Sequence, residues 1–184
     1  MARGWEKIKD RVDSCFSQVY EASKYKPKNV LAIGAKRPFL IDGFKRANVE
    51  ITTYTPPPGR KFTLNCEKAF DVIVCAGVLA HMPYKDFGLC LKEINKAARK
   101  GAVIVLPDAG PCMKVNQVIV SGLSIPAYKV EDVHYWEIGS FGYGLARVRA
   151  TIFAAGFTLE YTYRVPDNPF HRVFVLSKRD FEGL

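Results

Sequence analysis

Four consecutive residues carry side chains that can hold a ligand and move a proton, namely His134, Tyr135, Trp136 and Glu137. Two aromatic rings beside a histidine and a carboxylate can grip a planar or cationic molecule. Elsewhere, His81 follows an apolar run, and an imidazole that changes charge near neutral pH suits general-base catalysis. The candidate catalytic residues are therefore His81, His134 and Tyr135. The alternative is that the aromatic rings pack on the domain and that His81 caps or packs against the adjoining helix.

A binding site is expected where the predicted strands end. Apolar, β-branched runs within Lys28–Gly34 and Phe70–Pro83 are typical of buried parallel strands, and each leads into small or polar residues. In an open parallel sheet, ligands bind outside the carboxyl ends of the strands. The residues at the exits of the first four predicted strands are Gly34, Ala35, Lys36, Tyr54, Thr55, Asn65, Cys66, Glu67, Ala76, Gly77 and Val78.

Two cations lie at one of these exits. Lys36 and Arg37 precede Pro38, a residue that suits the first turn of a helix. Cations beside the free backbone donors of a helix N-terminus can hold an anion such as a carboxylate or a phosphate. The alternative is that both side chains belong to an exposed loop.

Apolar periodicity places these candidate residues on alternating strands and helices. Apolar residues at three- and four-residue intervals from Trp5 to Val19 predict an amphipathic helix over about residues 4–24. The triple proline at 56–58 ends one strand and leaves little room for a helix before the next. His171 is expected to pin the turn before the last strand. The predicted strands cover residues 29–33, 49–55, 61–64, 71–76, 102–106, 157–164 and 171–178, and the later helices cover about 38–47, 87–98 and 145–156.

This order of elements predicts an α/β protein with a three-layer α/β/α architecture. The sheet is expected to be Rossmann-like and mostly parallel, with an antiparallel last strand. The segment 113–140 is too long and irregular to be a simple connection, and its apolar content argues against disorder. We therefore expect an ordered lid in which His134, Tyr135 or Trp136 faces a pocket next to Gly77.

Composition and charge restrict the class of protein. An apolar share of 48% and a charged share of 24% are ordinary for a globular protein. The chain has no apolar run near the ~20 residues that a membrane span needs, and its N-terminus lacks a signal-peptide core, so a cytoplasmic location without membrane attachment is expected. Five scattered cysteines, never in C-x-x-C spacing, predict neither a metal site nor a disulfide framework. The net charge of +9 makes this a basic protein and favours an anionic partner, nucleic acid included, or a basic solvated surface.

Several phrases together resemble the class I S-adenosylmethionine-dependent methyltransferases. They are FDVIVCAGVLAHMP at Phe70–Pro83, KNVLAIG at Lys28–Gly34 and the ending NPFHRVFVLSKR. The resemblance implies S-adenosyl-L-methionine as cofactor, held by the strand-exit residues named above, and methyl transfer to an unidentified acceptor, with a small molecule favoured. It aligns Gly34 with the first glycine of the family's cofactor loop and His81 with a histidine after the family's fourth strand. Glu67 falls where relatives contact adenine, although it is equally well interpreted as a surface carboxylate.

The resemblance also suggests how the chain is organised. A single methyltransferase-like domain is expected over residues 1–184. Its parts are an N-terminal helix at 1–27, a cofactor-side half at 28–106, an acceptor-side lid at 107–140, and the last helix with two closing strands at 141–184.

Two positions depart from the family pattern. Ala35-Lys36-Arg37-Pro38 stands where the family usually has G-x-G, and Tyr54 and Thr55 stand where it supplies an acid to the ribose hydroxyls. A hydroxyl cannot reproduce the bidentate, charge-assisted hydrogen bonds of a carboxylate. The sequence therefore leaves two main hypotheses, a methyltransferase and a non-catalytic, degenerate methyltransferase-fold module for binding or regulation. A basic nucleic-acid-binding domain without catalysis is a third.

Overall fold

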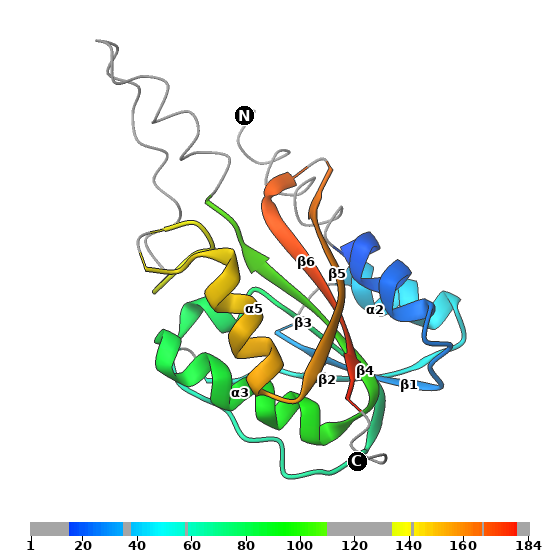
Figure 1. The fold of residues 1–184 in the computed structure, drawn as a ribbon. Coiled ribbons are helices and arrows are strands. Elements are labelled where there is room, and N and C mark those ends of the chain that lie inside the picture. The colour runs from blue at the N-terminus through cyan, green and yellow to red at the C-terminus, as the bar shows by residue number, and fades with distance from the viewer. Residues whose placement is uncertain are drawn as a thin grey trace.

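A computed structural model describes residues 15–34, 38–57, 59–109, 134–140, 142–166 and 168–179. Within the predicted N-terminal helix, residues 15–23 are helical, and residues 4–14 lie outside the described residues. The elements that follow are β1 (Asn29–Ile33), α2 (Pro38–Arg46), β2 (Glu50–Tyr54), β3 (Phe70–Ala76), the 3-10 turn η1 (Leu79–His81), α3 (Tyr84–Ala97), β4 (Ala98–Pro107), α5 (Leu145–Ala154), β5 (Phe157–Val165) and β6 (Asn168–Lys178) (Figure 1).

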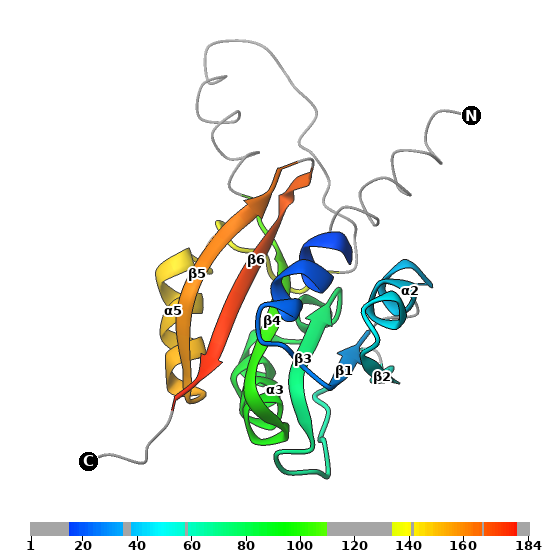
Figure 2. The same ribbon diagram turned by 90° about the vertical axis from the view of Figure 1, so that its right-hand side faces the viewer.

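The strands form one six-stranded sheet in the order β2-β1-β3-β4-β6-β5. The first four strands of this order run parallel, whereas β6 is antiparallel to both β4 and β5 (Figure 2). The predicted mostly parallel sheet with an antiparallel last strand is therefore confirmed. We refer to the side at which β1 to β4 end as the carboxyl end of the sheet, and to the opposite side as its amino end.

Alternate residues of the strands enter two separate apolar cores. On β3, Val72 and Val74 join the core shared with α2 and the helical residues 15–23, whereas Ile73 and Cys75 join the core shared with α3 and α5. Because both faces of the sheet are covered, the buried strands are apolar at nearly every position. The helices lie on the two sides of the sheet in Figure 2, which confirms the three-layer architecture.

Helix α3 shows how strongly the sequence specifies this packing. Phe87, Leu91 and Ile94 recur at helical spacing and are fully buried against the sheet. Burial of each such side chain contributes about 1.5–3 kcal/mol. The helix begins just after β3 ends and finishes just before β4 begins, so its first turn lies at the carboxyl end of the sheet and its last turn at the amino end.

The strand predicted over residues 61–64 does not form, and this prediction is wrong. Phe62 and Leu64 are buried in the core beneath α3, and Thr63 between them is exposed. The backbone N–H of Leu64 donates to the Glu93 carboxylate at 2.9 Å instead of joining the sheet. An alternation of apolar residues therefore marks an extended chain here, but not a strand.

The segment 134–140 is tied to the carboxyl end of the sheet by its backbone. The N–H of Tyr135 donates to the carbonyl of Ala80 at 2.8 Å, and the N–H of Ile138 donates to the carbonyl of Pro107 at 3.0 Å. These bonds join the segment to η1 and to the end of β4. Among the helices that the structure describes, none combines the length and apolar character needed to cross a membrane.

Candidate functional site

A cleft of about 510 Å³ opens at the carboxyl end of the sheet, where β1, β2 and β3 end. It is bounded by Gly34 after β1, Thr55 after β2, and Gly77 and Val78 after β3. Its volume falls within the range of about 300–1,000 Å³ that is typical of small-molecule sites. The position agrees with the rule for open parallel sheets, in which ligands bind beyond the strand ends.

Gly34 allows the ends of these strands to approach closely. Its φ of 80° is a left-handed conformation that favours glycine. A Cβ atom at this position would lie 2.2 Å from Cγ2 of Val78 and 2.7 Å from the carbonyl oxygen of Ala76. The N–H of Gly34 also donates to the carbonyl of Tyr54 at 2.8 Å. Any side chain here would therefore separate β1 from the exit of β3 and close the floor of the cleft.

Apolar groups form much of the cleft wall. Pro56 and Pro57 line one side, and Tyr135 lines the cleft from the 134–140 segment. The Tyr135 hydroxyl lies 3.6 Å from the point that a Cβ on Gly59 would occupy, so this side chain reaches across to the proline loop. At 59% exposure, the ring keeps a face available to a ligand. The wall is thus suited to a flat ring.

The cleft has few polar side chains and no acidic one among the described residues that line it. Thr55, His81 and Tyr135 supply its hydroxyl and imidazole groups. Tyr54, the other residue expected at the end of β2, instead packs edge-on against Phe62 with ring centroids 6.0 Å apart, and it does not line the cleft. Only Thr55 is therefore placed to contact a ligand at this strand exit.

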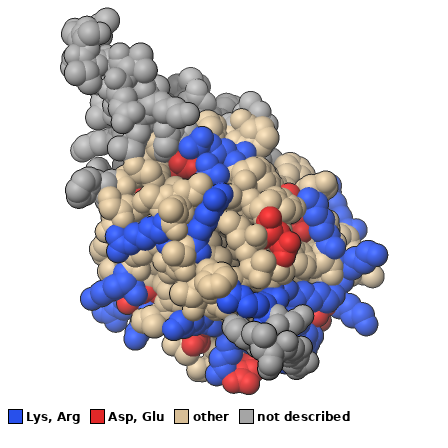
Figure 3. All heavy atoms as spheres, in the orientation of Figure 1, with Lys and Arg blue, Asp and Glu red and all other residues tan. Residues whose placement is uncertain are grey.

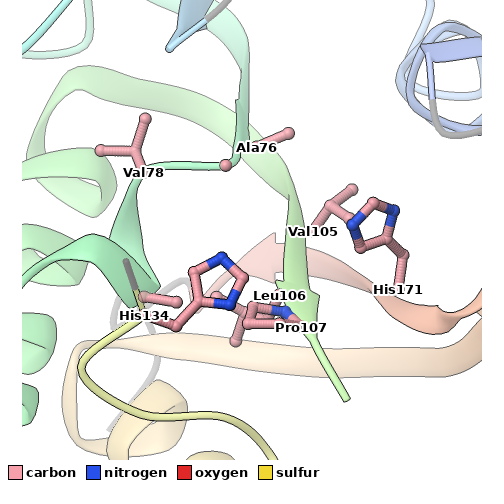
Figure 4. Close-up of a pocket in the computed structure, with 9 residues that line it drawn as sticks. Ala76, Val78, Val105, Leu106, Pro107, His134 and His171 are labelled. Atoms are coloured by element: carbon pink, nitrogen blue, oxygen red, sulfur yellow. The ribbon is translucent and has the colours of Figure 1, made fainter. Parts of the chain in front are cut away.

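A smaller hollow of about 30 Å³ adjoins the cleft, and the two share Gly77 and Val78. Its other lining residues come from the ends of β3 and β4, from Ala80 in η1, from His134 and from His171 on β6 (Figure 4). From the sequence, His171 was expected only to pin the turn before the last strand. The available signal was the antiparallel direction of the last strand, because the beginning of such a strand lies at the carboxyl end of the sheet.

The histidines at this end of the sheet have defined partners. The rings of His81 and His134 are in contact, with centroids 4.6 Å apart. Nδ1 of His134 lies 2.8 Å from Oε1 of the buried Glu137, and Nδ1 of His171 lies 2.9 Å from Nδ2 of the buried Asn168. His81 lines the cleft and His134 lines the hollow, so the ring pair connects the two cavities.

Three predicted binding residues lie elsewhere, because the strand that would have positioned them is absent. Asn65, Cys66 and Glu67 are not among the residues that line the cleft. Glu67 pairs with Lys96 in the last turn of α3 at 2.9 Å, which places it at the amino end of the sheet. The Lys96 ammonium lowers the pKa of this exposed carboxyl. The expectation that these three residues follow a strand exit is wrong.

Trp136 also differs from the expectation of a pocket-facing lid residue. It is 3% exposed and packs against Tyr84 and Phe87, with ring centroids 4.8 and 4.9 Å apart. Its ring therefore belongs to the core beneath α3. The neighbouring His134 and Tyr135 do line the two cavities.

The remaining predictions fall partly outside the described residues. Ala35, Lys36 and Arg37 lie outside them, as do residues 110–133 of the expected lid, so the anion site and most of the lid stay predictions. On the face shown in Figure 3, Lys and Arg side chains are scattered over several elements and do not form a single stripe.

Comparison with known proteins shows the fold. No protein-family model matches the chain, and no curated protein sequence matches it. Among solved structures, it is similar to magnesium protoporphyrin IX methyltransferase of Synechocystis PCC 6803 with bound SAH (TM-score 0.55, 13% identity, 96% of this chain and 84% of that one). It is also similar to 1,6-didemethyltoxoflavin-N1-methyltransferase of Burkholderia thailandensis, solved with bound 1,6-didemethyltoxoflavin and S-adenosylhomocysteine (TM-score 0.51, 16% identity, 84% of this chain and 72% of that one).

A third similar structure is the methyltransferase domain of bacterial CtHen1-C (TM-score 0.61, 7% identity, 92% of this chain and 99% of that one). The chain therefore has the fold of the class I S-adenosylmethionine-dependent methyltransferases, as the sequence resemblance predicted. At identities this low, the similarity shows the fold alone.

Proposed function

We propose that this chain is an S-adenosylmethionine-dependent methyltransferase that acts on a small-molecule acceptor. The observation that carries the proposal is the cleft at the ends of β1, β2 and β3, built around the constrained Gly34. Two proteins of similar fold were solved with SAH or S-adenosylhomocysteine bound. The proposed site for the same cofactor is this cleft, at the carboxyl ends of the parallel strands.

The residues of the cleft fit most parts of such a cofactor. Gly34 exposes backbone where a side chain would obstruct the floor, and Ala35 and Lys36 follow it in the chain. Pro57 and Tyr135 offer apolar and aromatic surface to an adenine ring, and the Thr55 hydroxyl can hydrogen-bond a ribose hydroxyl. When bound, S-adenosylmethionine supplies an electrophilic methyl group. The chain's own task is then to position an acceptor next to Gly77, Val78 and Ala76.

Three side chains are proposed to act on the acceptor. His81 and Tyr135 line the cleft, and His134 lines the hollow beside it. A histidine at this point can accept the proton that an acceptor loses on methylation. Tyr135 can hold a planar acceptor or cofactor ring against the cleft wall.

Titration with S-adenosylhomocysteine tests this proposal directly. Calorimetry is expected to show one site per chain, and the ligand should raise the melting temperature because it binds only the folded state. At 100 times Kd the stabilisation would be about 2.7 kcal/mol. Homocysteine alone serves as the control ligand, since it lacks the adenosyl group. Absence of heat and of a thermal shift at millimolar adenosylhomocysteine would contradict the proposal.

A second candidate function is a non-catalytic binding or regulatory module. Its support is the absence of any acidic side chain among the described residues of the cleft, with Thr55 at the end of β2. Such a module would remain folded and give no heat with adenosylhomocysteine. The same titration therefore separates the two functions.

A further inference from the structure

Two arginines lie directly opposite each other on the last two strands of the sheet. Arg164 on β5 pairs with Arg172 on β6 in the antiparallel register, and Figure 2 shows the two strands side by side. Like charges at directly opposite positions destabilise an antiparallel pair. Among the residues that the structure describes, the ion pairs of both arginines go to a single acid, Asp108. Two positive charges therefore share one negative charge, which leaves an excess of one positive charge.

Asp108 holds both guanidinium groups in place. Its side chain is 1% exposed, and it accepts from Nε of Arg172 at 2.6 Å and from Nε and Nη2 of Arg164 at 3.1 and 3.3 Å. Its backbone N–H donates to the carbonyl of Phe170 at 2.7 Å, and Asp108 also forms a bridge with Ile138. Because this acid is buried and its backbone is tied down, both guanidinium groups are oriented before any ligand binds. Such preorganisation lowers the cost of binding.

Three terminal nitrogens of the two arginines remain available to a ligand. Nη1 and Nη2 of Arg172 and Nη1 of Arg164 have no hydrogen-bond partner among the described residues. None of the three is among the fully buried atoms that lack a partner, so each reaches solvent. The Arg172 side chain is nevertheless only 13% exposed, against 37% for Arg164. The available donors of Arg172 are therefore recessed, unlike those of a surface side chain.

The shape of a guanidinium group determines which ligand fits. Two parallel N–H bonds along one edge match two oxygens of a carboxylate or a phosphate, whereas an ammonium group is a point charge. On Arg172 this edge consists of Nη1 and Nη2, because Nε already donates to Asp108. The excess positive charge of the cluster favours the same anionic groups, and the net charge of +9 attracts them at long range.

The arginine pair is separate from the two cavities but adjoins one of them. Arg172 lies opposite Leu106 in the register of β4 and β6, and Leu106 lines the hollow at the carboxyl end of the sheet. Neither arginine lines the hollow or the cleft. A ligand of this pair therefore binds beside the hollow and leaves the cleft open to a cofactor.

We propose that Arg164 and Arg172 bind the carboxylate or phosphate group of a small anionic molecule, at a site whose geometry is determined by Asp108. The anionic group accepts hydrogen bonds from Nη1 and Nη2 of Arg172, and the Arg164 guanidinium adds the second positive charge. This inference goes beyond the proposed methyltransferase function and does not depend on it.

Titration of the full chain with inorganic phosphate and, separately, with acetate tests the site. NMR of the arginine Nε–H groups follows each guanidinium, and through-bond correlations to the backbone assign each signal. With chloride holding the ionic strength constant, at least one of the two anions is expected to shift the Arg164 and Arg172 signals saturably. The anion that binds more tightly identifies the preferred group.

Arg99 is the internal control for this titration. It pairs one to one with Asp71 at 3.4 Å, so this pair has no excess charge. Its signal should move little with either anion. Shifts as large at Arg99 as at Arg172, or no saturable shift with either anion, would overturn the proposal.

Arg172→Lys tests whether the paired donors matter, since lysine keeps the charge and removes the planar edge. Affinity for the bound anion is expected to fall about tenfold, the effect of losing one hydrogen bond to a charged group. Arg99→Lys is the matched control and should leave the affinity unchanged. Equal affinity in Arg172→Lys would reduce the site to diffuse attraction and contradict the proposal. If Arg172→Lys does not fold, the wild-type titration still decides the question. Because no measurement here uses adenosylhomocysteine, the outcome is independent of the proposed cofactor.

Discussion

The two ends of the sheet use charged and polar side chains in different ways. At the amino end, the Asp71 carboxylate accepts from the backbone N–H of Lys28 at 2.7 Å and from Arg99 at 3.4 Å. Lys100 donates to the carbonyls of Tyr25 and Lys26 at 3.0 and 3.2 Å. These charges satisfy backbone groups and one another where strands begin, so they hold chain segments together.

At the carboxyl end, the same sheet leaves two cavities. The polar side chains that line these cavities are a threonine, a tyrosine and imidazoles, and two of the imidazoles are oriented by neighbouring side chains. The charged side chains at this end, such as the buried Asp108 paired with Arg164 and Arg172, do not line either cavity. The comparison suggests a division of roles along the strands. Substitutions at the amino end should change stability and leave binding intact, whereas those lining the cavities should mainly change binding.

The largest effect is expected from Trp136→Ala. This variant distinguishes packing in the core beneath α3 from ligand binding in the cleft. Removing this buried ring from its contacts with Tyr84 and Phe87 should lower the free energy of unfolding by about 3–5 kcal/mol, measured by denaturant titration. The adjacent Tyr135→Ala is the matched control. Because Tyr135 is largely exposed, its replacement should change stability by about 0.5 kcal/mol or less while weakening adenosylhomocysteine binding.

Gly34→Ala should lose both stability and binding. The positive φ costs about 1–3 kcal/mol for a residue with a side chain, and the contact with Val78 adds to this cost. The displaced strand exit should abolish binding of adenosylhomocysteine. Gly144→Ala is the control, since this glycine has a φ of −62° and no atom within 4 Å of a Cβ. Normal ligand binding by Gly34→Ala would show that the cofactor does not approach this backbone.

Asp71→Asn tests the amino end and should change stability with a defined pH dependence. The backbone N–H of Lys28, followed by Arg99, holds the pKa of this carboxyl below its usual value near 3.9. A carboxyl with a lowered folded-state pKa stabilises the protein above its unfolded-state pKa, and this contribution is lost as pH falls through the folded-state pKa.

At neutral pH the Asp71→Asn variant should therefore be about 1–3 kcal/mol less stable, as expected for hydrogen bonds to a charged group. The difference from wild type should shrink below about pH 4. Unfolding curves at several pH values measure it, and calorimetry should show unchanged adenosylhomocysteine binding. A loss of binding in this variant would contradict the division between the two ends.

Much of the fold could be predicted because the buried strands are continuous apolar runs between clear helix signals. β1 and β3 were located within a residue, and the strand exits followed from their order. The prediction of a strand over residues 61–64 was wrong because alternate residues are buried both in a strand and in an extended chain that joins no sheet. Because Asn65, Cys66 and Glu67 follow that predicted strand, they were predicted to lie in the binding site.

The positions of His134 and His171 at the carboxyl end of the sheet depend on tertiary contacts, and only some of these could be predicted from the sequence. His134 and Glu137 are close in sequence, so their proximity was visible. His171 and Asn168 join them only because β6 pairs antiparallel with β4, bringing His171 opposite Pro107. Predicting this contact requires the register of two strands more than sixty residues apart, which no local pattern encodes.

The smallest effect is expected from placing an acidic residue at position 55, directly after β2. Thr55 lines the cleft, and an aspartate there could accept hydrogen bonds from both hydroxyls of a ribose. Hydrogen bonds to charged groups contribute about 1.5–3 kcal/mol when shielded, and less at this exposed position. Thr55→Asp should therefore tighten adenosylhomocysteine binding by about tenfold, the equivalent of 1.4 kcal/mol.

Thr53→Asp is the matched control for this change, because it adds the same charge to β2 two residues before the cleft. A general effect of charge would appear in both variants, whereas contact with a ribose would appear only at Thr55. Weaker binding in Thr55→Asp alone would mean that the ligand presents negative charge at the exit of β2. That result would favour a binding module whose ligand is anionic at this position.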